Sequence, residues 1–550
     1  MNNQQISNGI KRLAAMMKLL DENPFKIRAF EKAARIVERH PEEMGILIDE
    51  DRLKHLDGIG DTLARIILYY AKSGGPTEER ELIARLPQGL PDLLELSGLG
   101  IKKVQILWQD LEITTVDLLH QACMLGKLSN VKGFGPKLEQ KLLESMEFRK
   151  RHIQDYHLDL ALSVAESWSR KLEALDCIHR IEVTGQLRRR NTLIQSVDFL
   201  MEASSTQVAE QLMGQFDLVP RSQNPIIFED VSGLPIHLWA SDSSEFGYHQ
   251  LKLTAGETFQ KKLEAIPARA NTQAMSEREL CQSLGIQWIE PELRDAFDEF
   301  PKDRNLVEPG DVKGVFHAHS TWSDGQNSLE EMVLEARNLG YNYLGISDHS
   351  QAAYYANGLK PDRVRNQWHD IDELNARYPD FHIFKGIEAD ILKDGRLDYD
   401  EELLRGFDFV IASIHSHFHL DPVTQTDRII RALQCPFTTM LGHPTGRMLL
   451  AREGYNPDLN AIIEAASEYE KIIEINTTPK RLDLDWEYLI QARELGVKIS
   501  INPDAHSVKG LKTIPLGVMM ARKAGLTAAD IVNTLNLKGM QNFLQARSNA

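Results

Sequence analysis

Long apolar runs are missing from this 550-residue sequence: nowhere do about eighteen apolar residues, the length that a membrane-spanning helix needs, follow one another. Residues 2–5 are polar, and no apolar segment with a small-residue cleavage site follows them, which predicts a soluble cytoplasmic protein. Only four cysteines occur, at positions 123, 177, 281 and 435. They are too few and too far apart for a disulfide framework or a cysteine-based zinc site.

Positive charge is also in short supply, because 63 Lys and Arg stand against 80 Asp and Glu, a net charge of −17. Such an acidic excess normally argues against nucleic-acid binding, since a phosphate backbone is bound through Lys and Arg. The excess is unevenly distributed, however: residues 1–150 carry 22 basic and 22 acidic side chains. The N-terminal part of the chain therefore remains a candidate for binding nucleic acid.

The length predicts several domains, because one domain usually takes about 100 to 200 residues. Apolar residues recur at helical spacing near the N-terminus, and strand-like segments mix with helices after about residue 150. From residue 306 onward, apolar strands alternate with amphipathic helices, which predicts a TIM-like barrel. The predicted fold is therefore multidomain α/β. Its predicted parts are a helical domain at 1–85, a second helical domain at 86–150, an α+β block at 151–300, a linker at 301–311 and the barrel at 312–550.

Three short segments with two glycines each open a new helical pattern, at residues 56–60, 96–100 and 131–135. Two glycines allow a tight turn and leave the first N–H groups of the next helix free to bind a phosphate. One Gly-x-Gly is a common turn, but three in register resemble the helix-hairpin-helix elements that hold a DNA backbone without reading bases. The resemblance implies DNA contacts at Gly58, Gly60, Gly98, Gly100, Lys102, Gly133, Gly135 and Lys137.

Histidine and carboxylate side chains stand repeatedly at the ends of the predicted barrel strands. For example, His317 and His319 close the first strand, and Glu388 directly follows another apolar run. Because the carboxyl ends of barrel strands converge on one mouth, residues far apart in the chain can meet there. The predicted metal ligands are His317, His319, Asp324, His349, Glu388, His415, His443, Asp504 and His506.

This set of six imidazoles and three carboxylates suits manganese, zinc or iron(II) better than calcium or magnesium. Nine ligands exceed the need of one ion, so two or three divalent metal ions are predicted. Such a cluster can activate water and neutralise charge on phosphate oxygens, which predicts phosphate ester hydrolysis. Glu388, Asp504 and His506 are its candidate catalytic residues. Arg447 and Arg481 are candidates to grip a substrate phosphate, with solvated surface arginines as the alternative.

The order of these ligands closely resembles the PHP family, the polymerase and histidinol phosphatase phosphoesterases, over residues 311–550. The resemblance divides the ligands among three metals: His317, His319, Glu388 and Asp504 at one; Glu388, His415 and His443 at a second; Asp324, His349 and His506 at a third. The remaining histidines of this block, at positions 369, 382, 417 and 419, are interpreted as structural.

A PHP barrel behind glycine-turn repeats resembles the bacterial family X DNA polymerases, and the similarity extends over the whole chain. Residues 23–30 resemble their N-terminal domain, residues 182–200 their palm and residues 246–256 their nucleotide-binding segment. The resemblance therefore implies a polymerase-like palm and thumb at 151–300, behind helix-hairpin-helix domains.

The polymerase site of that family uses three aspartates to hold two metal ions, and this sequence keeps one of them. Ser196 and His237 stand at two of the positions, so only Asp198 remains. A serine hydroxyl and a neutral imidazole bring no negative charge to magnesium, and we expect polymerase activity to be weak or lost. The alternative is that these short segments align elsewhere. Gln186 replaces a triphosphate-binding serine, and Ile66 falls where some relatives have a Schiff-base lysine, which argues against lyase activity.

Together these features predict a DNA repair protein that acts chiefly as a metal-dependent 3'-5' exonuclease or phosphodiesterase on gapped or 3'-ended DNA. Two other enzymes remain open, an active gap-filling DNA polymerase and a small-molecule phosphatase of the histidinol phosphatase type. A further alternative is a DNA-binding or nucleotide-binding scaffold with an incidental metal centre. The sequence indicates no membrane partner and no particular oligomeric state.

Overall fold

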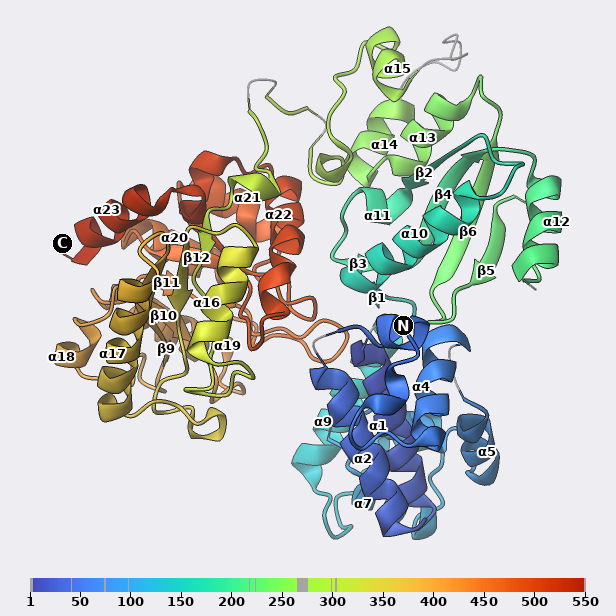
Figure 1. Cartoon of the computed structure of the whole chain (residues 1–550), viewed down its shortest axis with the longest axis horizontal. Coiled ribbons are helices and arrows are strands. Elements are labelled where there is room, and N and C mark those ends of the chain that lie inside the picture. Colours follow the sequence, from blue (N-terminus) through green and yellow to red (C-terminus); the bar gives the residue numbers. More distant parts are fainter. Residues whose placement is uncertain are drawn as a thin grey trace. The chain divides into compact units, whose positions relative to one another are not determined.

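The computed structural model describes residues 3–40, 42–73, 76–96, 98–216, 218–222, 224–264, 276–297, 299–301 and 304–548. The chain divides into two compact units. The first comprises Met1–Gln154 and Glu229–Leu234, and the second comprises Asp155–Phe228 and Pro235–Ala550. In Figure 1 the N-terminal helices are blue and cyan, the first sheet of the second unit is teal and green, and the barrel runs from yellow to red.

Within segment 1–154, the regular secondary structure of the described residues is helical, with turns and loops between the helices. The helices are α1 (Asn3–Leu19), α2 (Pro24–Arg39), α3 (Met44–Asp49), η1 (Leu53–His55), α4 (Asp61–Ser73), α5 (Thr77–Arg85), α6 (Leu90–Leu93), α7 (Ile101–Gln109), α8 (Val116–Met124) and α9 (Pro136–Arg151). The side chain of Asn23 caps α2 by accepting a hydrogen bond from the N–H of Phe25, and Pro24 occupies its first position. This confirms the helical N-terminal part. Apolar residues of α1, α2, α4 and α7 share one core.

The teal and green part of the second unit carries a four-stranded sheet in the order β2-β4-β6-β5. Strand β4 runs antiparallel to β2 and parallel to β6, so that Asp198 lies between Thr184 and His237. The strands are β1 (Tyr156–His157), β2 (Arg180–Thr184), β3 (Leu193–Ile194), β4 (Val197–Glu202), β5 (Ile226–Glu229) and β6 (Pro235–Ser241). The helices are α10 (Leu158–Glu173), α11 (Gly185–Arg188), α12 (Ser205–Phe216), α13 (Phe246–Thr254), α14 (Glu257–Glu264), α15 (Glu277–Ser283) and η2 (Pro291–Leu293).

A seven-stranded parallel sheet forms the C-terminal part, with strands in sequence order from β7 to β13. They are β7 (Gly314–Val315), β8 (Tyr343–Ile346), β9 (His382–Asp390), β10 (Phe409–Ser413), β11 (Met440–Leu441), β12 (Ile472–Asn476) and β13 (Ile499–Asn502). The helices of this part are α16 (Leu329–Asn338), α17 (Pro361–Arg377), α18 (Glu401–Leu404), α19 (Pro422–Gln434), α20 (Leu459–Glu468), α21 (Trp486–Glu494), α22 (Ile514–Lys523) and α23 (Leu537–Ser548). Almost every strand residue is buried, as in parallel sheets that helices cover.

The first and last strands meet just beyond their carboxyl ends and nearly close the barrel. A parallel bridge joins Ala318 to Ala505, where the N–H of His319 donates to the Ala505 carbonyl over 2.8 Å. Inside, the ring of Phe409 packs where a Cβ on Gly345 or Gly386 would overlap it. The predicted TIM-like barrel is therefore confirmed, with seven strands where a complete TIM barrel has eight.

The segment predicted as a linker, residues 301–311, lies against the barrel where it is described. The N–H of Val307 donates to the Leu526 carbonyl over 3.0 Å, and Leu306 bridges to Thr527. A short 3-10 helix, η3 (Pro309–Asp311), then leads into β7. Residues 302 and 303 lie outside the described residues. Among the described helices of the whole chain, none is long and apolar enough to cross a membrane.

Candidate metal centre, palm and nucleic-acid contacts

The barrel strands carry all nine predicted metal ligands to the mouth at their carboxyl ends. Strands β7, β10, β11 and β13 use the same step, because each ends two residues before a ligand: His317, His415, His443 and Asp504. Glu388 lies within β9 and His349 follows β8. Asp324 and His506 come from the loops after β7 and β13. His317 and His506, 189 positions apart in the chain, thus belong to one cluster.

The ligand atoms form four overlapping groups in which all atoms lie within 4.8 Å of one another. The groups are His319, Asp324, His349 and His506; His317, His443 and Asp504; His317, His319 and Glu388; and His349, Glu388 and His415. This grouping differs from the expected partition in three ways: His319 also joins the group of Asp324 and His506, His349 groups with Glu388 and His415, and His443 groups with His317 and Asp504. Every predicted ligand belongs to at least one group.

Glu388 occupies the centre of the cluster and is only 1% exposed. Its carboxylate oxygens lie 2.9 Å from His443 Nε2, 2.9 Å from His349 Nδ1 and 3.2 Å from His415 Nε2. Burial alone would raise the pKa of Glu388, but the surrounding histidines outweigh it and hold the pKa well below its ordinary value. The carboxylate is therefore charged and central enough to bridge two cations.

Several buried polar atoms of the cluster form no hydrogen bond among the described residues: His317 Nε2, both ring nitrogens of His319, His349 Nδ1 and Glu388 Oε2. His349 Nδ1 and Glu388 Oε2 lie 2.9 Å apart, but without the alignment of a hydrogen bond. Buried polar atoms are usually hydrogen-bonded, because leaving them unpaired costs free energy. Cations among these atoms would satisfy them together. Imidazole with carboxylate is also the donor chemistry that borderline divalent metals prefer. The residues present therefore fit divalent metal ions.

Two buried carboxylates behind the ligands orient the imidazole rings. Glu474 lies 2.6 Å from His317 Nδ1, and Asp390 lies 2.5 Å from His415 Nδ1. In both histidines the other nitrogen, Nε2, is then left to face the centre. Neither carboxylate is among the site residues predicted from the sequence. The available signal was their position, since Glu474 is a charged residue inside the apolar strand β12 and Asp390 follows Glu388 by two residues in β9.

The two predicted phosphate-gripping arginines differ in how far the protein already uses them. Arg447 donates to the carboxylate of Asp485 and to the backbone carbonyls of Arg481 and Leu482. Arg481 lies at the cluster, with its Nε 3.9 Å from Asp504 Oδ2, and its buried Nη1 has no hydrogen-bond partner among the described residues. The guanidinium of Arg481 is thus the one with donors left for a phosphate.

The three glycine turns of the N-terminal unit have the same geometry. Gly58, Gly98 and Gly133 adopt left-handed backbone angles, with φ of 88°, 96° and 91°, which favours glycine at each position. The second glycine of each pair, at 60, 100 or 135, directly precedes α4, α7 or α9. Both predicted lysines, Lys102 and Lys137, lie exposed in the first turn of their helix. The helix starts are therefore open to an anion.

In the four-stranded sheet, the three positions that the resemblance assigns to a polymerase site lie together. Asp198 and His237 are paired residues of β4 and β6, with His237 Nδ1 3.1 Å from Asp198 Oδ1. Ser196 donates its hydroxyl to Asp198 over 2.6 Å, and Trp239 Nε1 donates over 3.1 Å. Protein donors therefore surround the single remaining carboxylate.

The arginines beside this site are also occupied. Arg188 forms a two-bond pair with Glu277, at 2.7 and 3.1 Å, and Arg189 pairs with Asp295 at 2.9 Å. Asp295 also accepts a hydrogen bond from the buried Lys523 over 2.5 Å. These ion pairs compensate the positive charge of both arginines, which leaves the arginines less available to a phosphate group. Ile66, at the lysine position of some relatives, is completely buried in the N-terminal core.

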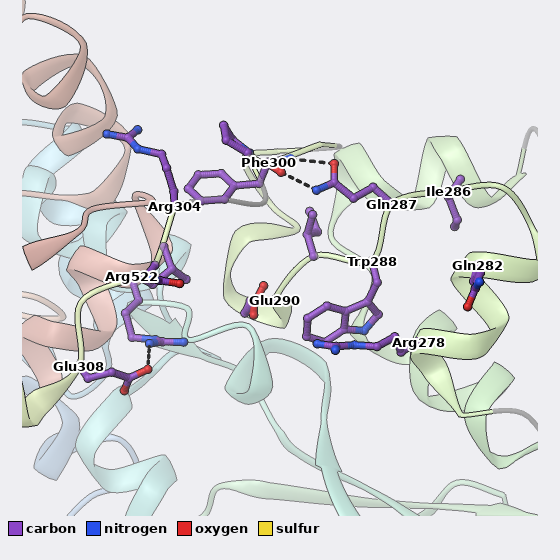
Figure 2. Close-up of a pocket in the computed structure, with 14 residues that line it drawn as sticks. Arg278, Gln282, Ile286, Gln287, Trp288, Glu290, Phe300, Arg304, Glu308 and Arg522 are labelled. Atoms are coloured by element: carbon purple, nitrogen blue, oxygen red, sulfur yellow. Dashed lines mark hydrogen bonds and ion pairs between the residues drawn. The ribbon is translucent and has the colours of Figure 1, made fainter.

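A separate cavity of about 820 Å³ lies away from every predicted site residue. Figure 2 shows Arg278 stacked against Trp288, and the amide of Gln287 bonded to the backbone of Phe300. Arg522 closes another side through its ion pair with Glu308. The side chains that line the cavity carry charges of both signs, and none of them belongs to the metal cluster.

Family comparisons match three parts of the chain. Residues 1–75 match a helix-hairpin-helix domain, residues 90–148 match a SAM-like helix-hairpin-helix tandem, and residues 316–478 match the PHP domain. These matches agree with the glycine turns and with the barrel mouth. The two helix-hairpin-helix regions indicate that the N-terminal unit binds DNA.

Comparison with curated proteins finds a relative that aligns with almost the whole chain. The DNA polymerase/3'-5' exonuclease PolX of Bacillus subtilis (strain 168) is 32% identical over 99% of this chain and 100% of its own length. A probable phosphatase of Thermoanaerobacter sp. (strain X514) is 29% identical over 40% of this chain and 85% of its own. Among solved structures, a Lactococcus lactis histidinol phosphate phosphatase with zinc, L-histidinol and phosphate covers 39% of this chain and 94% of its own, at 24% identity and a TM-score of 0.32. Because the Bacillus relative aligns with nearly the whole chain, this protein belongs to the family X DNA polymerases that carry a C-terminal PHP domain.

Proposed function

We propose that this protein is a metal-dependent phosphodiesterase that shortens DNA strands in the 3' to 5' direction through its PHP barrel, and that its polymerase activity is weak or lost. The observation that carries the proposal is the cluster of nine imidazole and carboxylate side chains with unpaired buried donor atoms. The name of the Bacillus relative joins both activities in one chain. The ligands of the hydrolytic activity are all present here, whereas those of the polymerase are not.

Two or three divalent ions, of manganese, zinc or iron, are proposed at the cluster. When bound, they supply a water of lowered pKa and positive charge beside the phosphate oxygens. Glu388 belongs to two of the four ligand groups. Asp504 belongs to a third group and His506 to the fourth. Arg481 would hold a phosphate oxygen with its free donors, at the edge of the site beside Asp504.

The DNA substrate is proposed to be gapped or 3'-ended. The three glycine turns offer backbone N–H groups at helix starts, which suit phosphates of any sequence. Lys102 and Lys137 add positive charge at two of these turns. Such contacts hold a strand without reading bases, as a nuclease in DNA repair requires. The site of action is proposed to be the cytoplasm.

Loss of polymerase activity follows from charge in the palm. Two-metal nucleotidyl transfer needs several anionic oxygens, and of the three positions Ser196, Asp198 and His237 only Asp198 supplies one. That carboxylate already accepts hydrogen bonds from Ser196 and Trp239. The neighbouring Arg188 is neutralised by Glu277. The site therefore lacks both the anionic ligands for two metal ions and an unpaired Arg188 for the phosphates of a nucleotide.

The test is to incubate the full chain and Mn²⁺ with a 5'-labelled oligonucleotide, with small phosphate monoesters as competitors. The proposal is supported if the labelled strand is shortened stepwise and if the monoesters do not suppress this shortening. The variant with His317→Ala and His319→Ala should lose the shortening but keep DNA binding, whereas His369→Ala, on the exposed face of α17, should behave as the unchanged protein. Hydrolysis of the monoesters alone would instead identify a small-molecule phosphatase.

A further inference from the structure

Two tyrosines stand exposed beside the metal cluster. Tyr354 is 85% and Tyr355 64% exposed, which is unusual for side chains of this size. The ring centroid of Tyr355 lies 6.5 Å from that of His349. The ring centroid of Tyr354 lies 6.3 Å from that of Tyr355, and these two rings meet edge to face. Both belong to a short 3-10 helix, η4 (Tyr354–Ala356), in the loop after β8.

The tyrosines lie on the side of the cluster that solvent can reach. His317, His319 and Glu388 are almost completely buried, whereas the side chains of Asp324 and His506 are about one third exposed. Tyr355 is close to that exposed edge. A phenol has an ordinary pKa of about 10, so the ring is neutral at physiological pH.

The loop holds both rings on a well-anchored backbone. The N–H of Leu359 donates to the His349 carbonyl over 2.8 Å, and the N–H of Gly358 donates to the Ala353 carbonyl over 3.1 Å. The side-chain amide of Asn357 donates to the carbonyls of Trp322 and Ser323, in the loop that carries Asp324. The tyrosine loop is thus bonded both to the strand end with His349 and to the loop with Asp324.

We propose that Tyr354 and Tyr355 form a stacking platform for the bases at the 3' end of a DNA strand. The inference rests on the proposed function, because a phosphodiester held at the cluster brings the terminal nucleoside within reach of Tyr355 and the next base toward Tyr354. Neutral aromatic rings stack on any base, so the platform fits an enzyme without sequence preference. The platform would also favour DNA over small phosphate esters, because those esters have no base to stack on the tyrosines.

The test compares two 5'-labelled single-stranded oligonucleotides that differ only at the 3' end. One has ordinary nucleotides, and its twin has baseless tetrahydrofuran residues at the last two positions. The full chain with Mn²⁺ should have a lower KM for the ordinary strand. Replacing both tyrosines, by Tyr354→Ala and Tyr355→Ala, should raise that KM at least about tenfold with little change in kcat, because stacking contributes to binding at each base. The KM for the baseless twin should not change.

Two further variants separate stacking from other roles of the tyrosines. Tyr354→Phe with Tyr355→Phe keeps the aromatic faces and should restore the low KM. Tyr469→Ala, a partly exposed tyrosine before β12 and so at the opposite end of the barrel, should leave both substrates unaffected. A wild-type protein that treats the two strands alike, or alanine variants that lose both equally, would overturn the platform.

The proposed function can fail separately from the platform. If the protein shortens neither strand, the exonuclease proposal is wrong, and fluorescence anisotropy of the same two strands still tests the platform. Base-dependent affinity that the alanine variants lose would then support it. Equal affinity for both strands would refute it, since the helix-hairpin-helix contacts are to phosphates and are common to the two.

Discussion

Glu474 and His317 form a completely buried pair in which the carboxylate Oε1 lies 2.6 Å from the imidazole Nδ1. The carboxylate is itself fixed, because its Oε2 accepts the N–H of His443 over 2.7 Å and its Oε1 accepts the amide of Asn502 over 3.2 Å. This arrangement sets the tilt of the His317 ring and directs Nε2 toward Glu388. Glu474, which belongs to none of the ligand groups, thus positions a completely buried ligand of the cluster.

Glu474→Gln should lower the affinity for divalent metal about 10- to 100-fold while the barrel stays folded, because an amide keeps the shape of the side chain but not the charge that makes His317 a strong ligand. Titration of the metal-free protein with Mn²⁺ measures this, and excess Mn²⁺ should restore much of the hydrolysis. Glu464→Gln, on the exposed face of α20, is the control. Equal affinities of the two variants would contradict the positioning role.

Gly9→Ala should lower the free energy of unfolding of the N-terminal helices by about 1 to 3 kcal/mol. The reason is that a Cβ on Gly9, in α1, would lie 2.5 Å from the ring of Tyr70, in α4. Gly45→Ala, in α3, is the matched control, since nothing lies within 4 Å of its Cβ and alanine favours a helix. Hydrogen exchange of the α1 amides in the full chain should accelerate for the first variant and not for the second. Unchanged hydrogen exchange in both variants would contradict the expected overlap between a Cβ at position 9 and the ring of Tyr70.

The sequence was sufficient to predict features that one position determines locally. A ligand two residues beyond an apolar strand predicts the barrel mouth, and Gly58 or Gly98 predicts a left-handed turn because other residues are strained there. Contacts between distant side chains could not be predicted in this way. Nothing in the sequence shows that Glu277 neutralises Arg188 from 89 positions away, or that His319 faces His506. Such pairs depend on how loops and helices pack in three dimensions.

Lys102→Ala combined with Lys137→Ala should weaken DNA binding for every sequence tested and reduce its salt dependence. Each lysine that contacts a phosphate contributes about 0.9 to the slope of log K against log salt for duplex DNA, so the slope should fall by roughly 1.8. Anisotropy titrations over a series of KCl concentrations measure it. Lys11→Ala is the control, because the Lys11 ammonium already pairs with Glu38 at 2.8 Å. A slope equal to that of the unchanged protein would mean that these two turns do not contact DNA.

Asp198→Asn should leave the shortening of DNA strands within about twofold of the wild type, and neither protein should extend a primer with Mg²⁺ or Mn²⁺. Robust incorporation by the wild type would refute the loss of polymerase activity. The same variant has a stability signature. Burial favours the neutral form of Asp198, but hydrogen bonds from His237, Ser196 and Trp239 outweigh it and lower the pKa.

A lowered pKa in the folded state means that the charged carboxylate stabilises the palm above the pKa of the unfolded chain, about 3.9, and that this stabilisation is lost as the pH falls further. The melting temperature of Asp198→Asn should therefore lie below that of the wild type at pH 7, and the gap should narrow toward pH 3. Ser205→Ala, at the start of α12, serves as a substitution outside this network. A gap that stays constant from pH 7 to pH 3 would mean that the charge of Asp198 contributes nothing to the palm.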